Sequence, residues 1–180
     1  MQTHLLTAHP AHPPVAITAI EARIIGADEH WLRLRWRIDG VQELVVPPFA
    51  GKGRADDLWQ TTCFELFLSP TGGENYCEFN LSPSERWAAY DFTGYRQGMS
   101  ERPLEREPQT AMRLGSSFAI FDAALPLSAL PRDDSAMNLA AVIQEQGGIK
   151  SFWALAHPAD KPDFHDPACF LATLPAPGPA

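Results

Sequence analysis

Residues 58–99 read LWQTTCFELFLSPTGGENYCEFNLSPSERWAAYDFTGYRQGM, and two runs in this stretch are apolar at every second position. Alternate side chains of an extended strand point to opposite faces of a sheet, so each run predicts a β-strand with one buried face. The segment SPTGGE between the runs is rich in turn residues and predicts an antiparallel hairpin. The faces expected in the core are Phe64, Leu66 and Leu68 on one strand and Cys77, Phe79 and Leu81 on the other.

The second face of this hairpin is chemically mixed, because it carries Cys63, Glu65, Phe67, Tyr76, Glu78 and Asn80. Only registers of one parity keep the apolar face inside. One such register sets Glu65 opposite Glu78, and the register slipped by two residues sets it opposite Asn80. We interpret this face as a binding wall, since ligand sites combine apolar surfaces with a few convergent polar groups. The alternative interpretation is that residues 96–113 cover the face and that its acids pair with Arg96, Arg102, Arg106 or Arg113.

Seventeen prolines and twelve glycines divide the chain into short runs, and long stretches with helical periodicity are lacking. This pattern predicts an all-β fold with little helix. We expect a two-sheet antiparallel β-sandwich of the immunoglobulin or jelly-roll type. The expected strands are 18–25, 31–38, 43–46, 62–68, 75–81, 87–92, 117–124, 137–144, 149–156 and 169–174, with a helical turn within 125–130.

The positions of the prolines and glycines also indicate the domain boundaries. Residues 15–174 are expected to form one domain, after an extended arm over residues 1–14 and before a flexible tail over residues 175–180.

In the strand at 87–92, the side of Ala88, Tyr90 and Phe92 is the more apolar one, which leaves Trp87 on the wetter side.

The net charge of −8, from 14 basic against 22 acidic residues, opposes binding to nucleic acid or to anionic membranes. The amino-terminal residues lack a basic segment followed by an apolar one, and no run approaches the roughly 18 apolar residues of a membrane span. We therefore expect a cytoplasmic protein. The odd set Cys63, Cys77 and Cys169 is expected to be reduced, and without CxxC or HxxxH spacing no zinc site is expected.

Titratable residues gather at HPADKPDFH, residues 157–165. His157, Asp163 and His165 could form turns and cap the end of a strand, or they could contribute to a site, because loops on a rigid sheet carry binding residues. A His–Asp acid–base pair would need a nucleophile, and no motif such as GxSxG supplies one. The acidic loops could hold calcium, although they lack the ligand spacing of an EF-hand.

Three blocks of the sequence, LWQTTCFELFL, YCEFNLSPSERWAAYDFTGYRQGM and SFWALAHPADKPDFHDPACFLATL, resemble the bacterial DOMON-like family. That family is similar in fold to the family-nine carbohydrate-binding modules, and the resemblance extends over most of the chain. It implies a noncatalytic sandwich with a ligand-binding face. Related modules hold a sugar between aromatic rings, which directs attention to Trp59 and Trp153. Some DOMON domains hold haem through a Met and a His, and the candidates here are Met99, His157 and His165.

We therefore expect a noncatalytic protein that binds a small molecule, a carbohydrate or a related polyhydroxylated compound, without a cofactor. The alternatives are a protein-interaction module, a haem-binding domain, and a glycoside-processing enzyme in which Glu65 and Glu78 act as acid and base. The expected ligand-binding residues are Trp59, Glu65, Tyr76, Glu78, Asn80, Tyr95, Arg96, Trp153, His157, Asp163 and His165.

Overall fold

The computed structural model describes residues 2–177, which form strands joined by loops and by 3-10 helices of three residues each. The first strands are β1 (Thr3–Ala8), β2 (Ala19–Ala27), β3 (Trp31–Asp39), β4 (Gly53–Arg54), β5 (Cys63–Pro70), β6 (Tyr76–Leu81) and β7 (Arg86–Phe92). The remaining strands are β8 (Ser100–Glu101), β9 (Gln109–Leu114), β10 (Phe118–Pro126), β11 (Ser135–Glu145), β12 (Ile149–Ala154) and β13 (Ala172–Leu174).

Short helices lie in the connections: η1 (Val41–Glu43), η2 (Leu58–Gln60), η3 (Leu127–Ala129), η4 (Gln146–Gly148) and η5 (Pro167–Cys169). The prediction of an all-β fold with little helix is confirmed, and η3 lies in the segment expected to form a helical turn. Over residues 2–177, no helix has the length and apolar character needed to cross a membrane.

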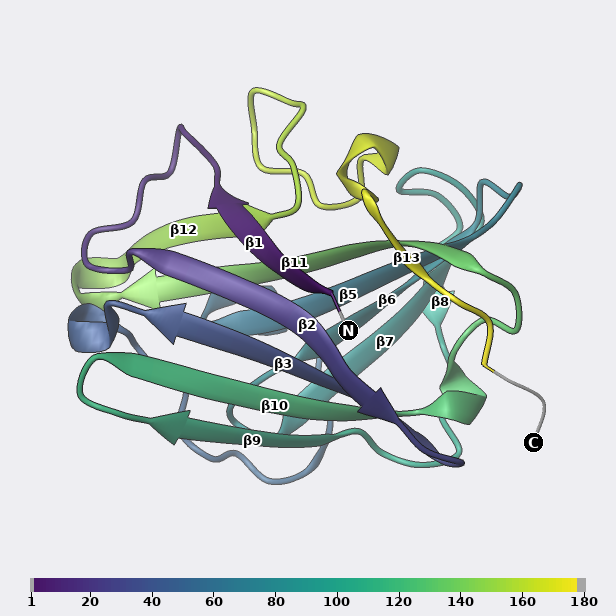
Figure 1. Cartoon of the computed structure of the whole chain (residues 1–180), viewed down its shortest axis with the longest axis horizontal. Helices are drawn as coiled ribbons and strands as arrows, with labels where there is room; N and C mark the ends of the chain where they lie inside the picture. The colour runs from purple at the N-terminus through teal and green to yellow at the C-terminus, as the bar shows by residue number, and fades with distance from the viewer. Residues whose placement is uncertain (1, 178–180) are drawn as a thin grey trace.

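The strands follow one hydrogen-bonded path in the order β4-β7-β6-β5-β11-β12-β1-β2-β3-β10-β9, with β13 added to β11 and β8 added to β7. The described pairs are antiparallel except β4–β7, which is parallel. The path curls so that β2, β3, β10 and β9 lie in front of β5, β6 and β7 in Figure 1. The expected pair of separate sheets is not confirmed, because β1 pairs with β12 on one side and with β2 on the other.

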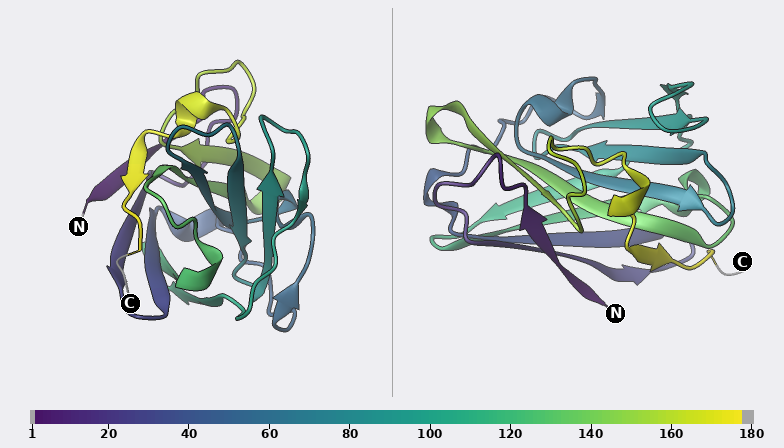
Figure 2. Two further views of the ribbon diagram at one scale, coloured as in Figure 1. Left: turned by 90° about the vertical axis from the view of Figure 1, so that its right-hand side faces the viewer. Right: turned by 90° about the horizontal axis from the view of Figure 1, so that it is seen from above.

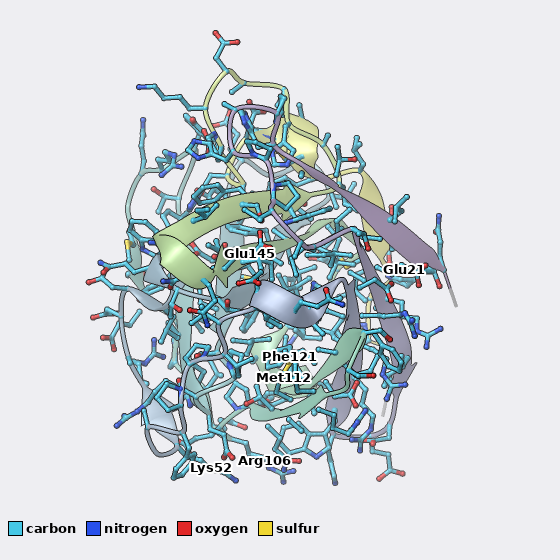
Figure 3. All side chains as sticks on the ribbon, turned by 90° about the vertical axis from the view of Figure 1, so that its left-hand side faces the viewer. Glu21, Lys52, Arg106, Met112, Phe121 and Glu145 are labelled. Atoms are coloured by element: carbon cyan, nitrogen blue, oxygen red, sulfur yellow. The ribbon has the colours of Figure 1, made fainter. Side chains whose placement is uncertain are left out.

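The main core lies between the two halves of the curled sheet and contains the apolar faces predicted for both hairpin strands. At its centre the rings of Phe64 and Phe121 stack with centroids 4.2 Å apart, and Trp36 lies 5.5 Å from Phe64. Figure 3 looks into the end of this space, where Phe121 lies with Met112 between the layers. Alternation in β5 and β6 therefore identified the buried face correctly.

The structure corrects the sequence prediction in several segments. Residues 3–8, expected in an extended arm outside the domain, form the strand β1 that joins the two halves, although only Leu6 among them is buried. Residues 43–46 make a single bridge, between Leu44 and Glu145, instead of a strand. The expected excursion over residues 96–113 contains β8 and most of β9. The proposed tail lies partly outside the described residues.

One buried acid fixes the loop between β1 and β2. The Glu145 carboxylate accepts backbone hydrogen bonds from Val15, Ala16 and Ile17 at 2.7, 2.6 and 3.2 Å. Figure 3 shows Glu145 at the end of the sheet. Since this carboxylate has three donors, its burial is compensated, and it holds the loop that carries His12 against the fold.

We expect Phe64→Ala to lower the free energy of unfolding by about 3–5 kcal/mol, because the stacked ring would be replaced by a cavity. Phe49→Ala is the control, since Phe49 is 70% exposed and should change stability by less than about 0.5 kcal/mol. Urea denaturation monitored by fluorescence measures both. Similar losses in the two variants would contradict the assignment of the core.

Candidate functional site

The register of the β5–β6 hairpin places Glu65 opposite Asn80 and Phe67 opposite Glu78. Of the two registers allowed by parity, the structure thus has the one that sets the two glutamates diagonally instead of face to face. This arrangement reduces repulsion, because directly opposed like charges destabilise a sheet.

Small residues flank these polar groups on the same face. Ala140 of β11 lies beside Glu65, and Ala88 of β7 lies beside Asn80. Because an alanine side chain ends at Cβ, the two positions leave space above the sheet. The sequence thereby builds a hollow whose floor is polar.

A cavity of about 1000 Å³ occupies this hollow, on the side of β11, β5, β6 and β7 that faces away from the main core. This volume is at the upper end of the usual range for small-molecule sites. In the view from above in Figure 2, the yellow segment leading to η5 lies across the strands, and it supplies one wall. The lining residues are His12, Asp56, Asp57, Trp59, Glu65, Glu78, Asn80, Tyr90, Phe92, Arg96, Met99, Ser100, Glu101, Val142, Phe152, Lys161, Pro162, Phe164 and His165.

The polar groups of the floor are only partly satisfied by one another. Asn80 Nδ2 donates to Glu78 Oε1 at 2.7 Å, while Asn80 Oδ1 is buried without a partner. Glu65 is 3% exposed, and its carboxylate makes no hydrogen bond to any other residue within 2–177. Buried polar atoms normally have partners, so these free acceptors mark the floor as a place for a ligand or water.

Burial changes the protonation of this floor. It raises the pKa of Glu65 well above its ordinary value, and the nearby Glu78 adds to the rise. Burial likewise raises the pKa of Glu78 to about 7, although the hydrogen bond from Asn80 and the charge of Arg96 oppose the rise. Both carboxyls are therefore much easier to protonate than exposed glutamates.

His165 connects the floor to the wall. Its Nδ1 lies 2.7 Å from the Tyr76 hydroxyl and its Nε2 lies 3.7 Å from Glu78 Oε2. Burial lowers the pKa of His165 to about 4, with a further contribution from Arg96, so the ring is neutral at pH 7. The contact with Glu78 is then not a salt bridge. If the neutral ring accepts a hydrogen bond from the Tyr76 hydroxyl at Nδ1, its own proton lies on Nε2, which faces Glu78.

The rim is held by a second set of contacts. Asp163 accepts hydrogen bonds from the Tyr95 hydroxyl and, at 2.7 Å, from the Arg96 guanidinium. Burial acts to raise the pKa of Asp163, but these donors lower it below its ordinary value. Two residues that line the cavity, Asp57 and Arg96, have left-handed backbone angles, with φ of 59° and 52°. Such conformations are rare for residues other than glycine and gather at functional sites.

The interpretation in which arginines cover and neutralise the acids does not match the contacts. Arg96 pairs with Asp163, Arg102 with Asp91, and Arg113 with Asp122. In the described part of the chain, no arginine pairs with Glu65 or Glu78. Residues 96–101 instead form one wall of an open cavity, through Arg96, Met99, Ser100 and Glu101.

The cavity brings together six of the eleven residues expected to bind a ligand: Trp59, Glu65, Glu78, Asn80, Arg96 and His165. Tyr76 and Asp163 hydrogen-bond to lining residues, and Tyr95 hydrogen-bonds to Asp163.

Trp153 and His157 are not brought to the cavity. Trp153 is 5% exposed in the main core, where its Nε1 donates to Ser151 Oγ at 2.9 Å. The strand alternates, so Trp153 points inward while its neighbour Phe152 lines the cavity. His157 Nε2 lies 2.8 Å from the carbonyl oxygen of Thr7 and ties the loop to β1.

Sequence reasoning missed several lining residues. Tyr90 and Phe92 share a face with Ala88, and the same alternation that was applied to β6 could have placed them over the floor. Trp87, expected on the wetter side, is 6% exposed in the main core, where the Arg54 guanidinium covers its ring at 4.6 Å. The loop with Asp56 and Asp57 gave no comparable signal, since its position depends on the parallel pairing of β4 with β7.

The described residues contain no group of three or more His, Cys, Asp or Glu side chains arranged to hold a metal ion. The three cysteines are free and buried. Burial raises the pKa of Cys77 and of Cys169 to about 12, so neither thiol is a reactive thiolate at neutral pH.

Two solved structures are similar in fold. One is a protein from Bacteroides uniformis ATCC 8492 described as a candidate carbohydrate-binding protein, with a TM-score of 0.63, 18% identity, and coverage of 93% of this chain and 83% of that one. The other is a family 9 carbohydrate-binding module from Caldicellulosiruptor kristjanssonii in complex with glucose, with a TM-score of 0.52, 10% identity, and coverage of 97% and 85%. No family model and no curated protein matches the sequence. The chain therefore has a fold similar to that of a family 9 carbohydrate-binding module, as the resemblance implied.

We expect Glu78→Gln to stabilise the protein at alkaline pH. The folded-state pKa of Glu78, about 7, lies above the ordinary 4.5, so its favourable contribution is complete below pH 4.5 and is lost as the pH rises through 7. Glutamine keeps the acceptor for Asn80 but carries no charge. The variant should gain roughly 2–3 kcal/mol above pH 8 and much less near pH 5.

Urea denaturation across this pH range measures the effect, with Glu21→Gln on β2 as the control. Figure 3 shows Glu21 on the outside of the fold. A gain in Glu78→Gln that does not change with pH would contradict the buried, protonatable state of this carboxyl.

Proposed function

We propose that this protein is a noncatalytic binding protein whose cavity takes a carbohydrate or a related polyhydroxylated small molecule. The observation that carries the proposal is the cavity of about 1000 Å³ with Glu65, Glu78 and Asn80 in its floor and aromatic rings in its walls. Sugar hydroxyls need fixed hydrogen-bonding groups, while the apolar faces of a sugar ring pack on aromatic surfaces. The similarity in fold to a module in complex with glucose supports the same class of ligand.

Trp59 is the ring best placed to pack on a sugar. It lies on η2, lines the cavity and is 48% exposed, so a face of the indole is available to a ligand. Tyr90, Phe92, Phe152 and Phe164 provide further aromatic surface. A single exposed apolar residue is common on protein surfaces, but an exposed tryptophan beside buried polar groups is not.

Binding is favoured over glycoside hydrolysis by the fold, which is similar to that of a family 9 carbohydrate-binding module. Hydrolysis by paired carboxyls requires one ionised carboxylate beside one protonated acid. Here burial raises the pKa of Glu65 and raises that of Glu78 to about 7, so Glu78 is only partly ionised at neutral pH. Release of nitrophenol from nitrophenyl glycosides that Glu78→Gln abolishes would establish the enzyme instead.

Membership of the DOMON-like family and a cytoplasmic location belong to the same proposal. The haem-binding alternative has less support from the contacts, because an axial ligand needs a free imidazole nitrogen or thioether. His165 has Nδ1 at the Tyr76 hydroxyl and Nε2 directed at Glu78. Met99 lines the cavity, but His157 does not and is tied to Thr7.

We expect saturable quenching of tryptophan fluorescence when the protein is titrated with glucose and with a panel of mono- and disaccharides. Trp59→Ala should weaken binding about tenfold, equivalent to about 1.4 kcal/mol, because the stacking surface is removed. Isothermal titration calorimetry checks the affinities. Phe49→Ala is the matched control, an exposed aromatic that does not line the cavity.

A flat response across the panel would contradict carbohydrate binding and would shift weight to the protein-interaction alternative. Binding with unchanged affinity in Trp59→Ala would contradict the assignment of the sugar to this cavity.

A further inference from the structure

When Glu65 and Glu78 are ionised, the floor of the cavity presents acceptors in excess of donors. Asn80 Oδ1 is unpartnered and its residue is 3% exposed, and the Glu65 carboxylate, equally buried, has no partner among the described residues. The amide nitrogen of Asn80 is already committed to Glu78. A ligand that reaches the floor must therefore bring donors, since acceptors left without partners in a buried site cost free energy.

The charged residues that line the cavity also favour a ligand that carries donors and positive charge. Five carboxyl residues line the cavity, namely Asp56, Asp57, Glu65, Glu78 and Glu101, against two side chains that carry a fixed positive charge, Arg96 and Lys161. Arg96 is bound to Asp163, and His165 is neutral at pH 7. Glu65 and Glu78 add to the negative charge of the lining when they are ionised, and a cleft lined mainly by one sign of charge concentrates ligands of the opposite sign.

The aromatic walls favour the same kind of ligand. Tyr90 and Phe92 rise from the strand next to Asn80, and Phe152 and Phe164 lie on the other side of the cavity. Aromatic rings attract cations through their negative faces. An acidic floor enclosed by such rings differs from a site built only for neutral hydroxyls, each of which has one donor and two acceptor lone pairs.

We propose that the ligand carries a protonated primary amine that enters the floor between Glu65, Glu78 and Asn80, which within the proposed carbohydrate class means an amino sugar. This inference rests on the proposed function and narrows it. An ammonium group has three donors and no acceptor, and it matches the three acceptor groups that the floor presents once both carboxyls are ionised. A single hydroxyl would satisfy one of them and would bring an additional acceptor.

An amine in the floor would change the protonation of Glu78. In this structure the pKa of Glu78 is raised to about 7, so part of the population is protonated near neutral pH. An ammonium group beside the carboxyl favours the ionised form. Binding of an amino sugar should therefore expel a proton from the floor to the buffer, whereas a neutral sugar should not.

The test is isothermal titration calorimetry of the full chain with glucosamine, glucose and N-acetylglucosamine, at about pH 6.5, where an amine is protonated. Glucosamine should bind at least about tenfold more tightly than either neutral sugar, and N-acetylation should remove the gain because it removes the charge. Titration in two buffers of different ionisation enthalpy should detect proton release with glucosamine alone.

The variant Glu65→Gln should reduce the ratio of glucosamine to glucose affinity from at least about tenfold to near one. Glu21→Gln, outside the cavity lining, should leave the ratio unchanged. If Glu65→Gln does not fold, the buffer comparison on the unaltered protein decides the question.

The outcomes separate the two proposals. Equal affinity for glucosamine and glucose, or no proton release, overturns the amine inference and leaves carbohydrate binding in place. Binding of 1,4-diaminobutane without binding of any sugar supports the ammonium site and overturns the carbohydrate class. If none of these compounds binds, both proposals fall.

Discussion

The structure depends on one constraint: the β5–β6 hairpin is buried on both faces, and only one of those faces is apolar. Phe64, Leu66 and Phe79 fix one face of the hairpin against the main core. Because side chains alternate along a strand, Glu65, Glu78 and Asn80 must lie on the opposite face. On that side Ala88 and Ala140 are too small to fill the space beside them. A polar floor inside a hollow is the geometric result of the alternation.

The polar groups of this floor destabilise the fold locally. Two carboxyls with raised pKa values, one amide oxygen without a partner and two left-handed residues at the rim all oppose stability. The main core, with Trp36, Phe64 and Phe121 at its centre, supplies the burial that tolerates them. Unfavourable groups concentrated in one cavity of an otherwise well-packed protein are the usual sign of a binding site.

Much of the fold could be predicted from the sequence because it depends on period-two alternation, which is a local signal. The bounds of β3, β5, β6 and β7 follow from it to within a residue or two. The register of β5 and β6 could not be chosen between two options, because both keep Phe64 inside. The role of β1 was missed, because its one buried residue, Leu6, gives no alternating pattern.

The site was predictable to the same degree and for the same reason. Alternation placed Glu65, Glu78 and Asn80 on a shared face, but it could not show that the face borders a cavity, because its walls come from loops distant in sequence. Trp153 shows the limit most clearly. Its aromatic character suggested stacking on a sugar, yet its parity on β12 directs it into the core and leaves Phe152 at the cavity.

The most direct measurement is the titration of the individual glutamate side chains by carbon-13 NMR. The carboxyl of Glu78 should titrate near pH 7 and that of Glu65 well above its ordinary range, and both should move to lower pH when glucosamine is added. Titration of both carboxyls near pH 4.5, unaltered by any added sugar or amine, would mean that this face is ordinary solvated surface and would contradict the binding site.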